Sequence, residues 1–179
     1  MKTFLRALAV GAALAAAGCA ELTPRAPGEA VEFEVTARFA ARYNGDAASG
    51  QIAWRHEPDR DEMLISSPFG QGLARVTRQA AQTTLVTSDQ QRYSAADPEA
   101  LTEQVLGFRL PLKGLADWVR ARPAPDAPAQ AERATDGRLL SLEQFGWHVQ
   151  YQAYEADRPS KLRLTYPGLE LRLAISEWK

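Results

Sequence analysis

The chain has 179 residues, 21 Lys and Arg against 22 Asp and Glu, a formal net charge of −1 and a single cysteine. This length suits one domain with its own core. A balanced charge without basic clusters argues against nucleic acid as a partner, and one cysteine excludes both an internal disulfide and a cysteine-type metal cluster. We expect no metal site.

Residues 1–18 have the layout of a secretory signal peptide, with a basic head, an apolar run and small residues directly before Cys19. The apolar run is shorter than the about 20 residues that a membrane-spanning helix needs. We therefore expect a cleaved leader over 1–18. Residues 19–30 contain few large apolar groups and two prolines, which is typical of a tether.

The first part of the body predicts a series of strands. Residues 33–43 alternate apolar and polar side chains, the pattern of a strand half buried in a sheet. Asn44 and Gly45 then favour a turn. Four further strands are expected at 50–56, 62–67, 72–78 and 82–88.

The middle of the chain predicts helices. Asp97 is suited to cap a helix that has Pro98 at its first position. A second helical segment is expected over 111–120, where apolar residues share one stripe. Residues 122–130 contain three prolines and predict a loop.

Strand patterns return to the end of the chain. They are expected at 132–135, 138–144, 145–153, 162–166 and 169–175, and the last two read as a hairpin around Pro167 and Gly168. About ten strands with a helical insertion, and no alternation of strand and helix, indicate a strongly curved or partly closed antiparallel sheet with helices against its concave face.

Several sequence motifs follow one another along almost the whole chain. They are Ala16-Ala17-Gly18-Cys19, the strand with Trp54, the loop 67–72, the segment 107–118, the turn 144–147 and the closing run 171–173 before Trp178. In this order they resemble the LolB family of outer-membrane lipoproteins, and the first resembles a lipobox. Phe33 and Ala37-Arg38 depart from the family's Trp and Gly-Arg.

The resemblance implies a single unclosed antiparallel β-barrel, or half-barrel, over residues 31–179, with helices as a lid over an apolar cavity. A member of this family would receive acylated lipoproteins from the periplasmic carrier LolA and insert them into outer-membrane lipid. It would be a monomer, anchored to the outer membrane by lipid on Cys19, facing the periplasm and without another cofactor. The expected residues of the cavity wall are Phe39, Trp54 and Trp147, and those of the lid are Leu112, Leu115 and Trp118.

The resemblance also assigns the loop Pro68-Phe69-Gly70 to membrane insertion. Phe69 lies at the tip of an expected hairpin, where a large apolar side chain has little core to enter. In the family this loop exposes an apolar residue that insertion needs. The alternative is that Phe69 folds back onto the sheet.

Other classes of function make different predictions. An enzyme would have only His56 and His148 as near-neutral bases, and no nucleophile elbow, phosphate loop or zinc-protease motif occurs; we expect no enzyme and read both histidines as surface or structural. An outer-membrane carrier of free lipids or hydrophobic small molecules would use the same half-barrel and remains the main alternative. A structural scaffold would need no cavity.

Overall fold

The computed structural model describes residue 22 and residues 30–179. The expected leader, Cys19 and all of the expected tether except residues 22 and 30 lie outside the described residues. The strands are β1 Phe33–Tyr43, β2 Asp46–Glu57, β3 Arg60–Ser66, β4 Gly72–Gln79, β5 Gln82–Thr87, β6 Arg92–Ala95, β7 Gln130–Arg133, β8 Leu139–Gln144, β9 Trp147–Glu155, β10 Arg158–Tyr166 and β11 Leu169–Trp178. The helices are α1 Pro98–Leu106 and α2 Leu115–Trp118.

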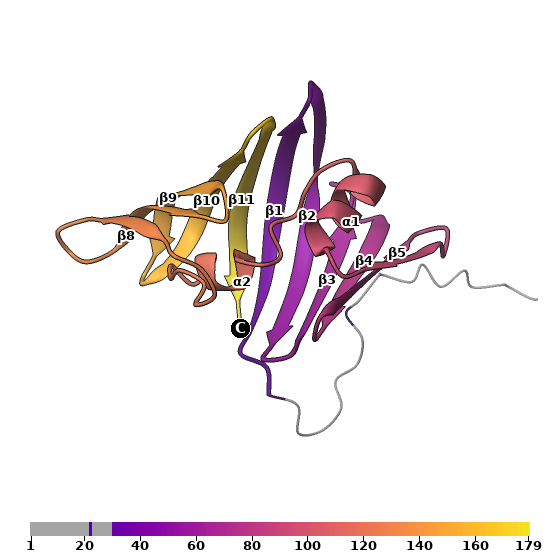
Figure 1. Ribbon diagram of the computed structural model, residues 1–179, viewed down its shortest axis with the longest axis horizontal. Helices are drawn as coiled ribbons and strands as arrows, with labels where there is room; N and C mark the ends of the chain where they lie inside the picture. Colours follow the sequence, from indigo (N-terminus) through magenta and orange to yellow (C-terminus); the bar gives the residue numbers. More distant parts are fainter. Residues whose placement is uncertain (1–21, 23–29) are drawn as a thin grey trace, which may run out of the picture.

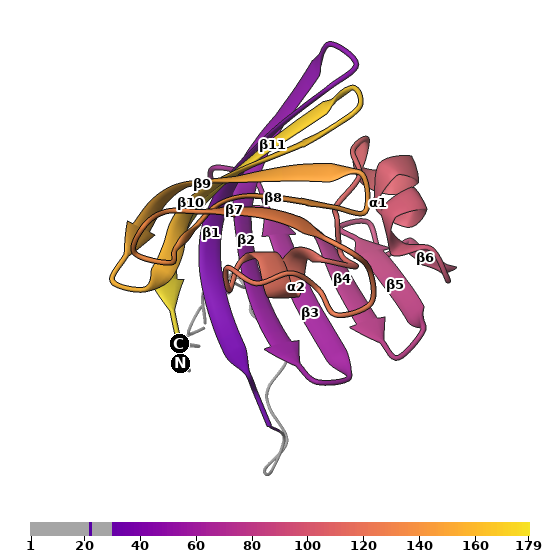
Figure 2. The ribbon, with the colours of Figure 1, turned by 60° about the vertical axis from the view of Figure 1, so that its left-hand side comes forward.

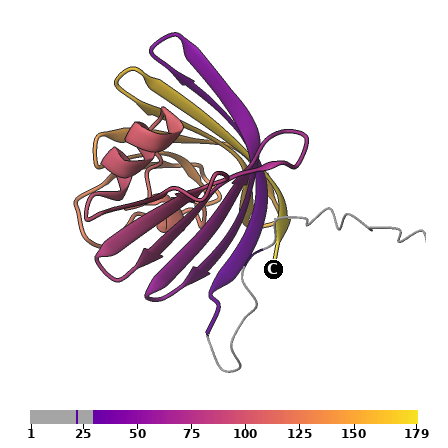
Figure 3. The same ribbon diagram turned by 90° about the vertical axis from the view of Figure 1, so that its right-hand side faces the viewer.

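All eleven strands form one antiparallel sheet in the order β6-β5-β4-β3-β2-β1-β11-β10-β9-β8-β7 (Figure 1). The first and last long strands, β1 and β11, pair in the middle and join the two meanders. The sheet curves strongly, and its edge strands β6 and β7 are not paired with each other (Figure 2). Both helices lie on the concave side (Figure 3). The expected fold, an unclosed antiparallel barrel with helices against its concave face, is confirmed.

Local sequence explains how the central strands meet. Asn44 and Gly45 have positive φ angles of 50° and 92°, which lets β1 and β2 join through a tight hairpin turn. At Gly50, an added Cβ would lie 2.1 Å from the backbone oxygen of Ser66 and 2.9 Å from the ring of Phe39. Only glycine therefore lets β2 pass β3 this closely.

The first helix begins as its sequence predicts. The carboxylate of Asp97 accepts hydrogen bonds from the backbone N–H groups of Glu99 at 3.0 Å and Ala100 at 3.3 Å, and Pro98 is the first helical residue. Gly107, at φ 82°, ends the helix in the left-handed conformation. Among the described residues, no helix is long and apolar enough to cross a membrane.

Several expected boundaries differ from the structure. The expected helix over 111–120 is wrong in length, because α2 has one turn and gives way to tight turns that end at Ala121, φ 56°. Phe145 and Gly146 are not strand residues, since their φ angles of 53° and 77° form the turn between β8 and β9. The strand β6 was not expected, because its four residues show no buried face.

Candidate functional site

The concave face of the sheet is an apolar wall. On β1 every second side chain is buried, as the period of two predicts. The inward-facing apolar residues of the strands include Phe33, Val35, Ala37, Phe39, Ala41, Ile52, Trp54, Met63, Ile65, Val76, Leu142, Trp147, Val149, Leu162, Leu164, Leu171, Leu173 and Ile175. These side chains provide a continuous surface that could hold either protein side chains or the hydrocarbon chains of a ligand.

The segment between the two meanders covers this wall. We call residues 98–125, which contain α1, α2 and the stretches that follow them, the lid. Figure 2 shows α2 lying across the concave face in front of β1 to β3. The apolar side chains that the lid buries are Leu101, Phe108, Leu110, Leu112, Leu115, Trp118 and Val119.

Aromatic rings join the lid to the wall on both halves of the sheet. Phe108 of the lid lies 5.7 Å from Phe39, measured between ring centroids, and Trp118 lies 6.4 Å from Trp147. The structure thus brings together the residues expected as wall and as lid, with Trp54 beside Phe33 at 4.9 Å. The lid's own side chains pack against the wall in the region expected for acyl chains.

A buried glutamine fastens the end of the lid. Gln144, 3% exposed, accepts hydrogen bonds from the indole N–H of Trp118 and the backbone N–H of Ala124, both at 2.9 Å. Its amide nitrogen donates to the carbonyls of Ala124 at 2.7 Å and Ala127 at 2.8 Å. Tyr151 donates to the carbonyl of Trp118 at 3.0 Å, and burial raises the pKa of this phenol. Sequence analysis gave Gln144 no role; its only signal was a polar residue at an inward-facing position.

A second polar cluster ties the lid to the start of β1. The guanidinium of Arg120 forms an ion pair with Glu32 and lies 3.2 Å from Asp117 and 3.4 Å from Nε2 of His56. It also covers the ring of Phe33 at 5.2 Å. His56 is buried, so the structural reading of this histidine fits better than the surface reading.

Asp61 connects His56 of that cluster to Trp54 of the wall. Its carboxylate accepts a hydrogen bond from the indole N–H of Trp54 at 2.9 Å, lies 2.6 Å from Nδ1 of His56 and pairs with Arg78 at 2.5 Å. Burial by itself raises the pKa of Asp61, but the hydrogen bond with His56 and the charge of Arg78 outweigh it and hold this pKa below its ordinary value.

The lowered pKa predicts acid-sensitive stability. A carboxyl group with a depressed folded-state pKa stabilises the fold fully above its unfolded pKa of about 3.9 and loses this contribution as the pH falls through the folded value. We expect Asp61→Asn to be less stable than the wild type at pH 7, and the difference to shrink near pH 3. Urea unfolding at both pH values measures this. Asp59→Asn, in the neighbouring exposed loop, is the control, and an unchanged gap between pH 7 and pH 3 would contradict the prediction.

A third polar cluster holds α1 near the other end of β1. Tyr43 donates to Glu103, while Arg109 pairs with Glu103 at 3.3 Å and Glu99 at 3.5 Å. The same guanidinium lies 5.4 Å from the ring centre of Tyr166. Burial raises the pKa of Glu99, and Arg109 opposes this shift. Polar groups around Gln144, Arg120 and Arg109 therefore hold the lid at three places around its apolar contacts.

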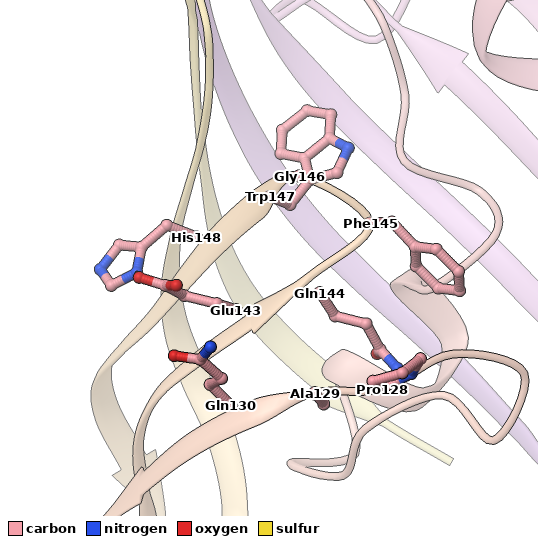
Figure 4. Close-up of a pocket in the computed structure, with 9 residues that line it drawn as sticks. All are labelled: Pro128, Ala129, Gln130, Glu143, Gln144, Phe145, Gly146, Trp147 and His148. Carbon is pink, nitrogen blue, oxygen red and sulfur yellow. The ribbon is translucent and has the colours of Figure 1, made fainter.

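One cleft borders the lid and another lies beside the β8–β9 hairpin. The first, of about 830 Å³, opens between the sheet and the lid and is lined in part by His56, Arg78, Leu112, Lys113, Ala116 and Arg120. The other, of about 480 Å³, lies between residues 128–130 and the β8–β9 hairpin (Figure 4). Figure 4 also shows Trp147 and His148 on opposite sides of β9, so only Trp147 belongs to the wall. His148 lies on the partly exposed side, 3.4 Å from Glu143.

The loop between β3 and β4 presents Phe69 to solvent. The backbone N–H of Ser67 donates to the carbonyl of Gln71 at 2.8 Å, and that of Gly70, at φ 84°, donates to the carbonyl of Ser67 at 2.9 Å. These bonds fix the turn through Pro68, and the side chain of Phe69 is 98% exposed. The alternative in which Phe69 folds back onto the sheet is wrong. The loop projects from the sheet on the side away from the helices (Figure 3).

Comparison with known proteins places this architecture in a family. The model of the family described as outer membrane lipoprotein LolB matches residues 31–178. The chain belongs to the LolB family. The outer-membrane lipoprotein LolB of Thiobacillus denitrificans is 38% identical over 98% of both chains. That of Azoarcus sp. is 37% identical over 99% of this chain and 96% of the relative, and that of Chromobacterium violaceum 35% over 97% and 98%.

Solved structures share the fold at low sequence identity. A LolA-superfamily protein from Nitrosomonas europaea superposes with a TM-score of 0.52 and 10% identity over 87% of both chains. A DUF1329 family protein from Desulfovibrio piger gives 0.55 and 6% over 86% of both. Membership of the LolB family assigns the chain to lipoprotein localization at the outer membrane, with lipoproteins as clients. LolB is not a known enzyme family.

Proposed function

We propose that this LolB-family chain, anchored by lipid on Cys19 and facing the periplasm, accepts acylated lipoproteins from the periplasmic carrier LolA and inserts them into the outer membrane. One observation carries the proposal: an unclosed sheet buries its apolar concave face under a lid that is a separate segment of the chain. When the lid moves, the same wall becomes available to acyl chains. We propose that the chain acts as a monomer.

The energetics favour an exchange of apolar partners. Each methylene buried from water is worth about 0.8 kcal/mol, so an unprotected triacylated cysteine would cost on the order of tens of kcal/mol in water. Side chains such as Phe108, Leu110 and Leu115 lose their contacts with the wall when the lid opens, and acyl chains replace those contacts. Because burial is exchanged and not lost, transfer between two such cavities needs only a difference in affinity and no nucleotide.

The exposed loop supports the second half of the proposal. A phenylalanine at 98% exposure gains nothing from water, but it gains by entering the interfacial region of a bilayer. We propose that Phe69, held by Pro68 and Gly70, enters the inner leaflet of the outer membrane and disturbs its packing at the site of delivery. A passive carrier of free lipids has no need of this residue.

Mixing loaded carrier with this protein tests the proposal. A fluorescently labelled lipoprotein bound to LolA is incubated with an excess of the domain 31–179, and the two proteins are separated by size or affinity tag. We expect the cargo to move to the domain without added nucleotide. Cargo that stays on the carrier contradicts the proposed function, and heat-denatured domain serves as the control for passive loss of cargo.

A further inference from the structure

One buried indole has no hydrogen-bond partner within the part of the chain that the structure describes. The chain has four tryptophans, all within the described residues. Three indole N–H groups have acceptors: Trp54 donates to Asp61, Trp118 to Gln144 and Trp178 to the carbonyl of Pro159. For Nε1 of Trp147, no acceptor exists among the described residues, although the side chain is only 1% exposed. An N–H group buried without an acceptor is costly and rare in folded proteins.

The position of this indole suggests what satisfies it. Trp147 lies on the wall between two other rings, with Tyr166 of the sheet at 5.1 Å and Trp118 of the lid at 6.4 Å between centroids. Val149 follows Trp147 on the same buried face of β9, and both residues belong to the apolar core. The N–H is therefore a buried donor without an acceptor among the described residues, and Trp118 of the lid forms one side of its environment.

We propose that the indole N–H of Trp147 is a polar recognition point for an acyl carbonyl of the cargo. This inference rests on the proposed function and adds a specific contact to it. A hydrocarbon chain offers no acceptor, whereas the carbonyl that links each fatty chain to its head group offers two lone pairs. When Trp118 moves away with the lid, a carbonyl at the top of an acyl chain takes its place beside Trp147 and accepts the hydrogen bond.

The contact has consequences for both selectivity and loading. Apolar burial alone does not distinguish an acyl chain from an alkyl chain of equal length, because the hydrophobic effect is non-directional. A hydrogen bond to a carbonyl does distinguish them, and in a dry site it also removes the unsatisfied donor of the closed state. The closed lid is thus less favourable than its apolar packing suggests. Cargo with a carbonyl satisfies the indole N–H of Trp147, whereas a hydrocarbon chain without a carbonyl does not.

Two synthetic ligands test the proposal. One is a peptide whose N-terminal cysteine carries a diacylglyceryl group, and the other is its dialkyl ether counterpart, which has the same chain lengths and no ester carbonyl. We expect the wild-type domain to bind the diacyl peptide about tenfold more tightly, as a well-placed hydrogen bond predicts. In Trp147→Phe, which keeps an aromatic ring but has no donor, we expect this ratio to fall to about one.

The ratio separates hydrogen bonding from any change in packing or stability. Trp178→Phe is the matched control, because the indole N–H of Trp178 is already bonded to the carbonyl of Pro159 and this residue is not part of the wall; its ratio should remain about tenfold. Two-dimensional ¹H–¹⁵N NMR gives a direct readout. The diacyl peptide should move the indole N–H signal of Trp147 downfield, and the ether should not.

Each outcome has a distinct meaning. Equal binding of both peptides to the wild type, or a tenfold ratio that persists in Trp147→Phe, overturns the inference and leaves the proposed function intact. An indole signal of Trp147 that does not respond to the bound diacyl peptide also overturns it. Failure of both peptides to bind the wild type contradicts the proposed function itself, and the inference falls with it.

Discussion

Phe69→Glu is expected to abolish insertion of lipoproteins into membranes while leaving acyl-chain binding unchanged. Burial of a phenylalanine side chain is worth about 1.5–3 kcal/mol, and a charged carboxylate in its place opposes entry into the interface. Insertion should therefore fall by at least about tenfold. Delivery of a labelled lipoprotein from the loaded protein to vesicles, followed by flotation, measures the effect.

The stability of this variant separates insertion from folding. Since Phe69 is 98% exposed, the change in unfolding free energy should be within about 0.5 kcal/mol. Phe69→Leu keeps an apolar tip and should insert cargo normally. Leu140→Glu places the same charge at another exposed apolar residue, on β8, and should have no effect on insertion. Wild-type insertion by Phe69→Glu would contradict the role of Phe69 in insertion.

Gln144→Leu is expected to loosen the lid. The substitution leaves the indole N–H of Trp118, the backbone N–H and carbonyl of Ala124 and the carbonyl of Ala127 without their partner. Each buried group left unsatisfied costs about 1–3 kcal/mol, and part of this is recovered when water reaches an opened lid. We expect the closed state to lose about 2–4 kcal/mol, seen as faster hydrogen exchange across residues 98–125.

A looser lid should also bind chains more readily. If only the open state accepts an acyl chain, apparent affinity rises with the population of that state, by tenfold for each 1.4 kcal/mol lost by the closed state. A fluorescent fatty-acid probe should therefore bind Gln144→Leu at least about tenfold more tightly. Gln152→Leu, on an exposed position of β9, is the matched control. Unchanged exchange in the lid, with normal probe affinity, would show that Gln144 does not hold it.

Parts of the site could be predicted from the sequence because they depend on neighbouring residues only. The period of two in residues 33–43 identified the buried face of β1, and hence Phe39, since side chains of a strand alternate between two faces. Asp97 and Pro98 predicted the start of α1 because capping involves only neighbouring backbone groups. Pro68 and Gly70 predicted the turn that carries Phe69, but the residues alone left its exposure open, and the structure decided it.

Other parts depend on residues far apart in the chain. Gln144 meets Trp118 across 26 positions, and Arg120 meets Glu32 across 88. Nothing in the local pattern around a buried glutamine or an arginine after a short helix specifies such a partner. Gly114 is similar: an added Cβ would lie 2.3 Å from the ring of Trp118, so this glycine is needed only because of how that indole packs.

By itself, the sequence determined most of the strands, the position of the helical insertion, the turn at Pro68 and Gly70 and the resemblance to the LolB family, because these follow from periodicity, turn chemistry and the order of motifs. Only the tertiary structure decided that the lid fills the concave face, which polar groups hold it there and that Trp147 is left with an unsatisfied N–H. The physical reason is that packing and hydrogen-bond satisfaction are properties of surfaces brought together by folding. A one-dimensional pattern shows which side chains are buried, but not what they meet.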